Sequence, residues 1–350
     1  MGSILGILFH ALGGFAAGSF YIPIKQVKGW HWASAWMILG IAAWVISPIL
    51  FAYLTVDKPL EVIAQTDISA FAITYIFGVL WGIGGLTFGL SMRYLGISLG
   101  MTVALGLCTA FGTLIPPIFN GTFTNLIHTD TGFITLIGIL LCLVGIIIVG
   151  FAGVQKEKQY RMENNVKTSA IHEFDFKKGL LVAIISGILS ACFAFGLEAG
   201  KPIAELTSTM GTNDLFKNNV LLVYILLGGI TSNGIYSLFL NYRKKSFSDY
   251  TIKTQHRNNN YIWAMLGGIT WYLQFFFYGM GTTYIGKNLE FASWSIHMAF
   301  IILISNLWGI YYNEWQGVAK KTNVTLVLGL TVILASILLI GLASTISPYL

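Results

Sequence analysis

Ten long apolar stretches constrain this chain of 350 residues more than any other feature. A membrane-spanning α-helix needs about 20 consecutive, mostly apolar residues. Stretches near that length occupy residues 4–23, 34–54, 70–91, 96–118, 132–152, 178–198, 218–240, 261–281, 288–310 and 324–345. A membrane β-barrel would instead show short segments of alternating polarity. The sequence therefore predicts an all-α integral membrane protein with ten transmembrane helices.

Composition supports this prediction by exclusion. Only 10% of the residues are charged, against about 25% in soluble domains. That value excludes a soluble enzyme, a disordered protein and a nucleic-acid binder, so membrane lipid is the expected surrounding and no nucleic-acid partner is expected. The sequence holds no phosphate-binding loop and no metal-ligand spacing. We therefore expect no cofactor and no metal, and an ion gradient is the default energy source.

Lys and Arg gather in alternate loops. Sixteen of the 20 follow the first, third, fifth, seventh and ninth stretches, and four lie in the other loops. Because positively charged loops stay in the cytoplasm, these five loops are predicted to be cytoplasmic and both termini to face outward. The first stretch lacks a basic leader and a cleavage site, so we expect a retained span and not a signal peptide.

Residues 190 positions apart correspond between the third and eighth stretches. The corresponding pairs are Trp81 with Trp271, Gly89 with Gly279, Tyr94 with Tyr284, Leu95 with Ile285 and Gly96 with Gly286. Two halves with five spans each would enter the membrane from opposite sides, which predicts a 5+5 inverted repeat. The halves are residues 1–152 and 178–350, joined by a polar cytoplasmic linker over 153–177. Chance matching among apolar helices is the poorer explanation.

Ionisable residues inside membrane spans are costly and mark function by default. Glu290, Trp294 and His297 are spaced for one face of a helix. This pattern suggests Glu290 as the proton-coupling group of a transporter. The alternative is an ion pair with Lys287 at the outer membrane interface.

An aromatic-rich segment precedes that face. Residues 271–278 hold six aromatic side chains. A sugar presents an apolar face of C–H groups and a rim of hydroxyls, so it needs an aromatic platform beside polar partners. We assign substrate binding to Trp271, Gln274, Tyr278, Trp294, His297 and His10. For His10, a simple interhelical hydrogen bond is an equally good alternative.

Five further residues are assigned gating or structural roles. They are Lys25, Arg93, Lys201, Glu198 and Trp81. Glu198 lies one turn before Lys201 at the end of a span, which predicts an ion pair between them. Arg93 falls in a predicted cytoplasmic turn, where it either pairs at a gate or only marks the topology.

Several segments resemble one transporter family over nearly the whole length. They are Tyr21-Ile22-Pro23-Ile24-Lys25, Trp81-Gly82-Ile83-Gly84, Met92-Arg93-Tyr94-Leu95-Gly96, Phe176-Lys177-Lys178-Gly179, Ala199-Gly200-Lys201-Pro202, residues 271–278, Ser293-Trp294 and His297-Met298. On these segments the chain resembles the L-rhamnose–proton symporters of the drug/metabolite transporter superfamily. The resemblance implies a ten-helix 5+5 inverted fold in the bacterial inner membrane with both termini periplasmic. It also implies proton-driven import of L-rhamnose, or in some members L-lyxose or L-mannose.

Three positions depart from that family. Gly85, Glu290 and Glu198 stand where members carry Asn, Asp and Asn, so Glu290 keeps a titratable carboxyl while Gly85 removes a candidate sugar partner. The function we expect is L-rhamnose–proton symport by alternating access. The alternative is an exporter of another small solute on the same fold. A membrane-embedded enzyme is disfavoured because two acids within ten spans are too few for a catalytic cluster.

Overall fold

The computed structural model describes residues 2–95, 97–163, 176–252, 255–286, 290–312 and 315–346, and these residues form helices and connecting turns only. The long helices are α1 (Gly2–Ser19), α3 (Trp32–Ile41), α6 (Ile68–Leu95), α7 (Ile97–Phe119), α9 (Asp130–Glu163), α10 (Phe176–Ala199), α12 (Asn219–Lys244), α14 (Arg257–Ile285), α15 (Ser293–Tyr311) and α16 (Lys320–Ile346). The shorter ones are α2 (Tyr21–Ile24), α4 (Ser47–Thr55), α5 (Pro59–Gln65), α8 (Phe123–His128), α11 (Lys201–Thr209) and α13 (Ser248–Thr251).

Eight described segments are long and apolar enough to cross a membrane. They are Ile4–Ile24, Trp32–Thr55, Ile68–Phe88, Asp130–Lys156, Lys177–Thr209, Asp214–Lys244, Ser293–Tyr311 and Lys320–Ala343. The all-helical prediction is therefore confirmed, with eight candidate spans. The two remaining expected stretches form α7, whose described apolar part is the shorter Val103–Phe119, and α14, in which Trp, Tyr, Gln and Gly residues interrupt the aliphatic ones.

The second expected span is one rod made of three consecutive helical segments, two α-helical and one π-helical. Helix α3 passes without a break into a π-helical turn, η1 (Ala42–Ile46), and then into α4. Pro48 lies inside this rod, directly after the π-helical turn, where its lack of an N–H removes one helix hydrogen bond. The rod therefore continues across a position at which the backbone is locally widened.

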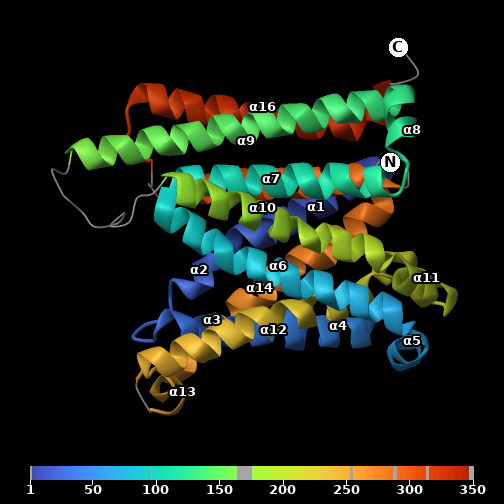
Figure 1. The fold of residues 1–350 in the computed structure, drawn as a ribbon, viewed down its shortest axis with the longest axis horizontal. Helices are drawn as coiled ribbons and strands as arrows, with labels where there is room; N and C mark the ends of the chain where they lie inside the picture. Colours follow the sequence, from blue (N-terminus) through green and yellow to red (C-terminus); the bar gives the residue numbers. More distant parts are fainter. Residues whose placement is uncertain are drawn as a thin grey trace.

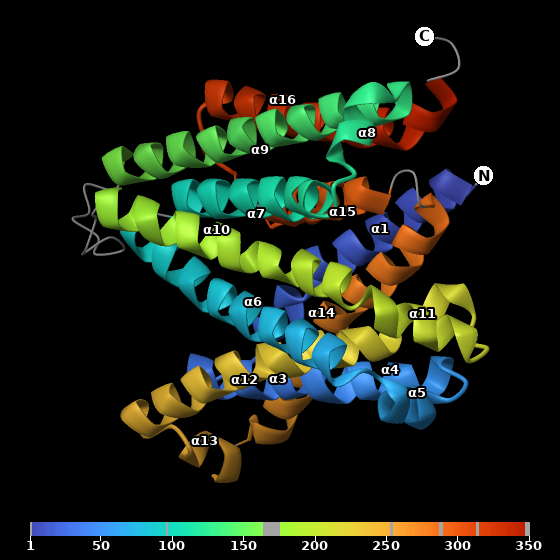
Figure 2. The same cartoon turned by 45° about the vertical axis from the view of Figure 1, so that its right-hand side comes forward.

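The helices lie in layers that cross at shallow angles (Figure 1). Helices α9 and α16 form an outer pair, and α12 with the α3–α4 rod lies on the opposite side. Between them α1 packs on α14 and α15, while α10 packs on α6 and α7. The start of α1 and the end of α16 lie at the same end of the molecule as α11, and α13 lies at the other end (Figures 1 and 2).

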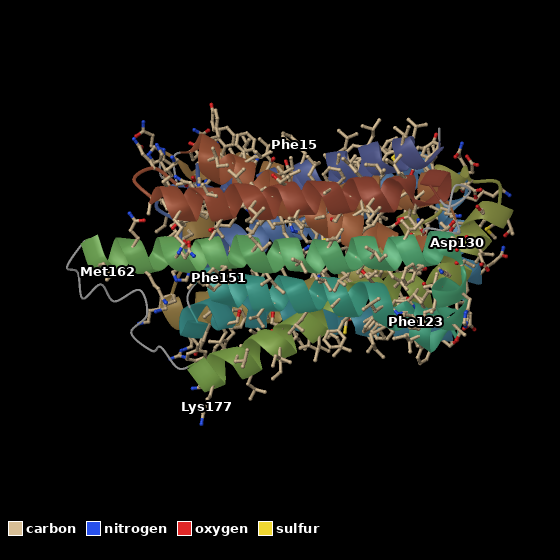
Figure 3. The ribbon with its side chains drawn as sticks, turned by 90° about the horizontal axis from the view of Figure 1, so that it is seen from above. Phe15, Phe123, Asp130, Phe151, Met162 and Lys177 are labelled. Carbon is tan, nitrogen blue, oxygen red and sulfur yellow. The ribbon has the colours of Figure 1, made fainter. Side chains whose placement is uncertain are left out.

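The outer surface of the layered helices is apolar. Phe15 on α1 is 52% exposed and Phe151 on α9 is 60% exposed, and both point outward between the ends of the molecule (Figure 3). Asp130 and Met162 stand at the two ends of α9 in the same view. Contiguous apolar surface of this kind is rare on soluble monomers, but it suits contact with lipid chains.

Helix α1 approaches its neighbours closely through glycine. A Cβ at Gly14 would lie 2.4 Å from Cβ of Phe300, and one at Gly18 would lie 2.7 Å from Cγ2 of Ile304. Close approach of this kind is what small residues four positions apart allow in membrane helices.

The expected linker over 153–177 is partly helical. Helix α9 continues through the charged segment to Glu163, and residues 164–175 lie outside the described part of the chain. The cysteines Cys108, Cys142 and Cys192 are buried and free.

Candidate functional site

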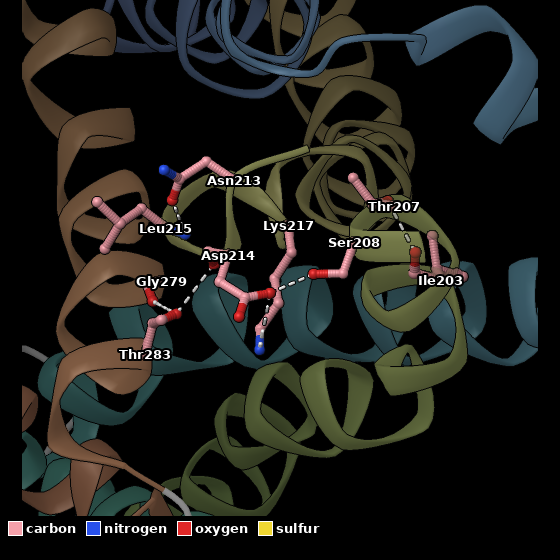
Figure 4. Close-up of polar contacts among 9 residues, drawn as sticks. All are labelled: Ile203, Thr207, Ser208, Asn213, Asp214, Leu215, Lys217, Gly279 and Thr283. Atoms are coloured by element: carbon pink, nitrogen blue, oxygen red, sulfur yellow. Dashed lines mark hydrogen bonds and ion pairs between the residues drawn. The ribbon is translucent and has the colours of Figure 1, made fainter. Parts of the chain in front are cut away.

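Helix α14 is anchored to other elements at both of its ends, which places the aromatic segment 271–278 between them. Near its start, the Asn260 side chain exchanges two hydrogen bonds with the Lys28 backbone, Nδ2 to O at 2.7 Å and N to Oδ1 at 2.9 Å. Near its end, the Thr283 hydroxyl donates to the backbone oxygen of Asp214 at 3.2 Å (Figure 4). The loops before α3 and before α12 therefore hold opposite ends of this helix.

The Asp214 connection is itself well ordered by polar contacts. The side-chain oxygen of Asn213 accepts from the backbone N–H of Leu215 at 3.0 Å, and Lys217 Nζ lies 4.0 Å from Asp214 Oδ1. The Ser208 hydroxyl donates to the Asp214 carboxylate (Figure 4). This local network lets a short loop serve as a fixed anchor for α14.

Three aromatic side chains meet where α1, α14 and α15 pack together. The ring centroids of His10 and Tyr278 are 5.3 Å apart, those of Tyr278 and His297 are 5.1 Å apart, and those of His10 and His297 are 5.9 Å apart. The exposed fractions of His10 and His297 are 0% and 1%. The structure thus brings together three of the six predicted substrate-binding residues from three separate helices.

Both imidazoles of this group are unsatisfied. Within the described part of the chain, neither ring nitrogen of His10 and neither ring nitrogen of His297 has a hydrogen-bond partner. The interhelical hydrogen bond considered for His10 is therefore wrong for the described residues. A buried donor or acceptor without a partner costs about 1–3 kcal/mol, so such groups in a native fold call for an explanation such as a bound ligand or water.

Two glycines leave the space that these imidazoles occupy. A Cβ at Gly13 would lie 3.0 Å from Cε1 of His297 and 2.8 Å from the backbone oxygen of Gln274. A Cβ at Gly281 would lie 2.9 Å from Nε2 of His10. Each histidine therefore points at a backbone that has no side chain to meet it.

An aromatic wall extends from the histidines along α14 to Trp271. Tyr278 contacts Trp294 at a centroid distance of 5.9 Å, Trp294 contacts Phe193 at 6.0 Å, and Phe193 stacks on Phe275 at 3.8 Å. Phe275 then contacts Trp271 at 5.1 Å. The two predicted stacking tryptophans therefore belong to one continuous surface.

Trp81 joins this wall from α6. Its ring lies 5.7 Å from that of Trp271 and 5.2 Å from that of Phe193. The structure places Trp81 with the predicted substrate residues and not with the ionic groups that share its predicted gating or structural role.

The polar groups of the wall are partly used within the protein. Gln274 is 5% exposed, and its Nε2 donates to the backbone oxygen of Trp271 at 2.9 Å. Trp294 Nε1 donates to the backbone oxygen of Cys108 at 3.2 Å. These bonds orient both side chains.

Glu290 does not lie on the α-helical face predicted for it. It begins a 3₁₀ turn, η4 (Glu290–Ala292), and α15 begins only at Ser293. Its carboxylate lies 3.3 Å from Lys201 Nζ, and its side chain is 36% exposed. Lys287, the alternative partner considered for it, lies outside the described residues. Trp294 and His297 do share α15, and both are buried there.

The predicted ion pair between Glu198 and Lys201 is confirmed at an Nζ–Oε1 distance of 2.9 Å. Lys201 therefore bridges two carboxylates, and Asn120 adds a hydrogen bond to Glu198 at 2.6 Å. We call Asn120, Glu198, Lys201 and Glu290 the acid cluster. It lies where α10 gives way to α11, at the end of the molecule that carries both termini (Figure 2).

The other predicted gating or structural residues lie elsewhere. Lys25 Nζ stands 5.0 Å from the ring centroid of Tyr312. Arg93 lies near the end of α6, and its side chain is outside the part of the chain that the structure describes.

The sequence patterns did not single out Phe193, Phe275 or Asn120. Phe193 stands in an ordinary apolar run, where nothing in the pattern distinguishes it. Phe275 lies inside the aromatic segment 271–278 and could have been included on that basis. Asn120 follows α7 and reaches the acid cluster only through folding.

Comparison with known proteins finds similar sequences over nearly the whole chain. A family model described as L-rhamnose-proton symport protein matches residues 2–345. The L-rhamnose-proton symporter of Yersinia pestis (strain Pestoides F) is 36% identical over 342 residues, which cover 97% of each chain. That of Salmonella gallinarum (strain 287/91 / NCTC 13346) is 36% identical over 344 residues, covering 97% of this chain and 98% of the relative.

Proposed function

The chain belongs to the L-rhamnose-proton symport protein family, and from that premise we propose that it imports L-rhamnose together with protons by alternating access. It is a multi-pass membrane protein of a transporter family and not an enzyme. The observation that carries the proposal is the set of four unpartnered imidazole nitrogens beside an aromatic wall, among the described residues. A deoxyhexose brings both hydroxyls for the imidazoles and C–H groups for the rings.

Ten membrane helices in two inverted halves belong to this proposal. Helices α7 and α14 would join the eight candidate spans. The helix contacts support a repeat because neighbours correspond between halves: α10 packs on α6 and α7 as α1 packs on α14 and α15. Likewise α12 packs on α6 as α3 packs on α14. Two halves with matching interfaces can exchange two packings around a central site.

Sugar binding is assigned to His10, Tyr278 and His297, which we call the histidine group, and to the aromatic wall. His10 and His297 would each donate one hydrogen bond and accept another, because a neutral imidazole has one donor and one acceptor nitrogen. Trp271 or Trp294 would stack on the apolar face of the sugar, with Gln274 and Tyr278 as further polar partners. Burial of the site in this conformation means that the sugar would enter only after the halves separate.

Proton coupling is assigned to Glu290. In the structure its carboxylate is held by Lys201, which also binds Glu198. A proton on Glu290 would remove its charge and weaken that ion pair, so Lys201 would remain with Glu198. The neutral side chain could then enter a drier environment at lower cost, and the end of the molecule near the acid cluster could change its packing. Lys25, Arg93 and Trp81 keep their proposed gating or structural roles.

The proposed location is the bacterial inner membrane with both termini periplasmic. The excess of Lys and Arg in alternate loops supports this orientation. The placement of both described ends on one side of the molecule fits an even number of crossings (Figure 1).

Whole-cell uptake of labelled L-rhamnose, with and without a protonophore, tests the function. Cells that express the chain should accumulate the sugar, lose accumulation with the protonophore, and make the unbuffered medium more alkaline when sugar is added. Sugar-independent efflux of another solute would support the exporter instead. Absence of rhamnose-dependent proton uptake would contradict the proposal.

A further inference from the structure

Trp44 differs from three other indoles, of which Trp294 is also buried, in how its N–H is satisfied. Trp36, Trp294 and Trp308 donate Nε1–H to protein oxygens at 3.3 Å, 3.2 Å and 2.8 Å. Trp44 is 3% exposed, and its Nε1 has no hydrogen-bond partner among the residues that the structure describes. Buried indole N–H groups usually find an acceptor, so this one is a candidate for a ligand contact.

The position of Trp44 links it to the proposed sugar site. Its ring stands nearly perpendicular to those of Trp271 and Trp81, at 88° and 89°, with centroid distances of 5.5 Å and 6.2 Å. The three indoles therefore form a corner where η1, α6 and α14 meet, beside the aromatic wall, and Trp36 contacts Trp44 at a centroid distance of 5.9 Å. An aromatic face is only a weak acceptor for an N–H donor. The neighbouring rings therefore leave the Nε1–H of Trp44 available to a stronger acceptor, such as a hydroxyl oxygen.

The backbone at Trp44 is also unusual. Trp44 is the central residue of η1, and π-helical turns inside α-helices occur frequently at functional sites. One turn earlier, a Cβ at Gly40 would lie 2.6 Å from Cζ3 of Trp44. The widened turn and the missing side chain together admit a large indole at a place where the helices are closely packed.

We propose that Trp44 determines sugar specificity, with its Nε1–H donating a hydrogen bond to one hydroxyl oxygen of the bound monosaccharide. Trp81 and Trp271 face the C–H groups beside that hydroxyl. The inference rests on the proposed function, since it names a further contact within the same site. It predicts that one hydroxyl of L-rhamnose is recognised by a residue of η1, whereas the histidines lie on α1 and α15.

Trp44→Phe removes the N–H and keeps an aromatic ring. We expect the KM for L-rhamnose uptake to rise about tenfold with Vmax within about twofold, as for the loss of one neutral hydrogen bond. Trp308→Phe is the matched control, because its N–H already binds the Ser19 hydroxyl and its ring has no contact with Trp44 among the described residues. Its KM should stay within about twofold of wild type. Replacement of Trp44 by 3-benzothienylalanine, which has sulfur in place of the N–H, gives the same test if the Phe variant does not fold.

Monodeoxy analogues of L-rhamnose identify the hydroxyl. For one analogue, wild type and the Trp44 variant should show equal KM values, since the bond is then absent from both. An unchanged KM for L-rhamnose in a folded Trp44 variant would overturn the inference and leave the proposed function standing. The inference would also be overturned if every analogue raised the KM by the same factor in wild type and in the Trp44 variant. Wild type that neither binds nor transports L-rhamnose would instead overturn the proposed function, and this inference with it.

Discussion

The histidine group and the acid cluster both contain ionisable residues assigned to function, yet they satisfy their polar atoms in opposite ways. His10 and His297 are buried, and their nitrogens have no partner among the described residues. In the acid cluster, Lys201 reaches two carboxylates, and the side chains of Glu198, Glu290 and Lys201 are 27%, 36% and 42% exposed. Glu290 and His297 are only seven positions apart in the sequence.

The difference indicates two kinds of role. Exposed ion pairs contribute about 0–1 kcal/mol and are easily exchanged for water, so the acid cluster can change partners at small cost. Buried groups without partners reduce stability, and they persist where function needs them. We therefore infer that the histidine group is built for a ligand and that the acid cluster is built to change its protonation and pairing.

Replacement of both histidines by leucine should have the largest effect. His10→Leu with His297→Leu should reduce the kcat/KM of L-rhamnose uptake by about 100-fold, from the loss of two or more sugar hydrogen bonds. The midpoint of thermal unfolding in detergent should stay the same or rise, because unsatisfied polar atoms are removed.

His31→Leu is the matched control for that pair. His31 caps α3 by accepting the Ala33 N–H at 3.2 Å, so its loss should lower the unfolding midpoint and leave KM unchanged. If the double leucine variant kept the wild-type KM, the histidine group would not bind the sugar, and the inferred difference in role between the two regions would be wrong.

Glu290→Gln should have the next largest effect. Uphill accumulation of sugar should fall by about tenfold, to the level seen with a protonophore, because a permanently neutral side chain cannot exchange a proton. Sugar counterflow, which needs no net proton movement, should stay within about twofold of wild type. Glu205→Gln, a change at an exposed acid on α11, should alter neither measurement. A Glu290→Gln variant that still accumulates sugar against its gradient would remove this residue from the coupling step.

Gly13→Ala tests whether transport depends on the packing around His297. The added methyl would meet the His297 ring and the Gln274 backbone, so we expect uptake to fall roughly fivefold through displaced binding groups. Gly106→Ala is the control, because its nearest neighbour would be 3.9 Å away, and it should transport normally. Equal activity of the two variants would show that the packing around His297 has no influence on transport.

The smallest effect is expected at an exposed carboxylate outside both regions. Asp67 precedes α6 and accepts hydrogen bonds from the Ser69 side chain and from the backbone N–H groups of Ser69 and Ala70. The Ser69 side chain, followed by the Ala70 backbone, lowers the pKa of Asp67. Its stabilising effect is therefore present above the unfolded pKa of about 3.9 and disappears as pH falls through the lower folded value.

Asp67→Asn should accordingly lower the unfolding midpoint slightly at pH 7, by less than His31→Leu lowers it. The difference from wild type should shrink as the pH is brought below about 4. A difference that grows on acidification would mean that the hydrogen bonds to Asp67 do not favour its charged form.

Much of the helical content could be predicted from apolar runs, and the Glu198–Lys201 ion pair from its spacing of three residues. The position of Glu290 could not. Periodicity placed it on the helix of Trp294 and His297, but it lies in a 3₁₀ turn beside Lys201, a residue far away in sequence. No role could be predicted for Trp44 or Phe193, because aromatic residues are common in apolar helices. The side chains that contact these two residues come from other helices.

The sequence by itself determined that this chain is helical and belongs in a membrane, because a long apolar segment must satisfy its backbone hydrogen bonds internally where water is absent. It also determined the residue types available to a sugar and a proton. Only the tertiary structure decided which polar groups are paired and which are not. That outcome depends on contacts between distant helices: Gly13 and Gly281 make room for two imidazoles, while Lys201 binds Glu198 and Glu290.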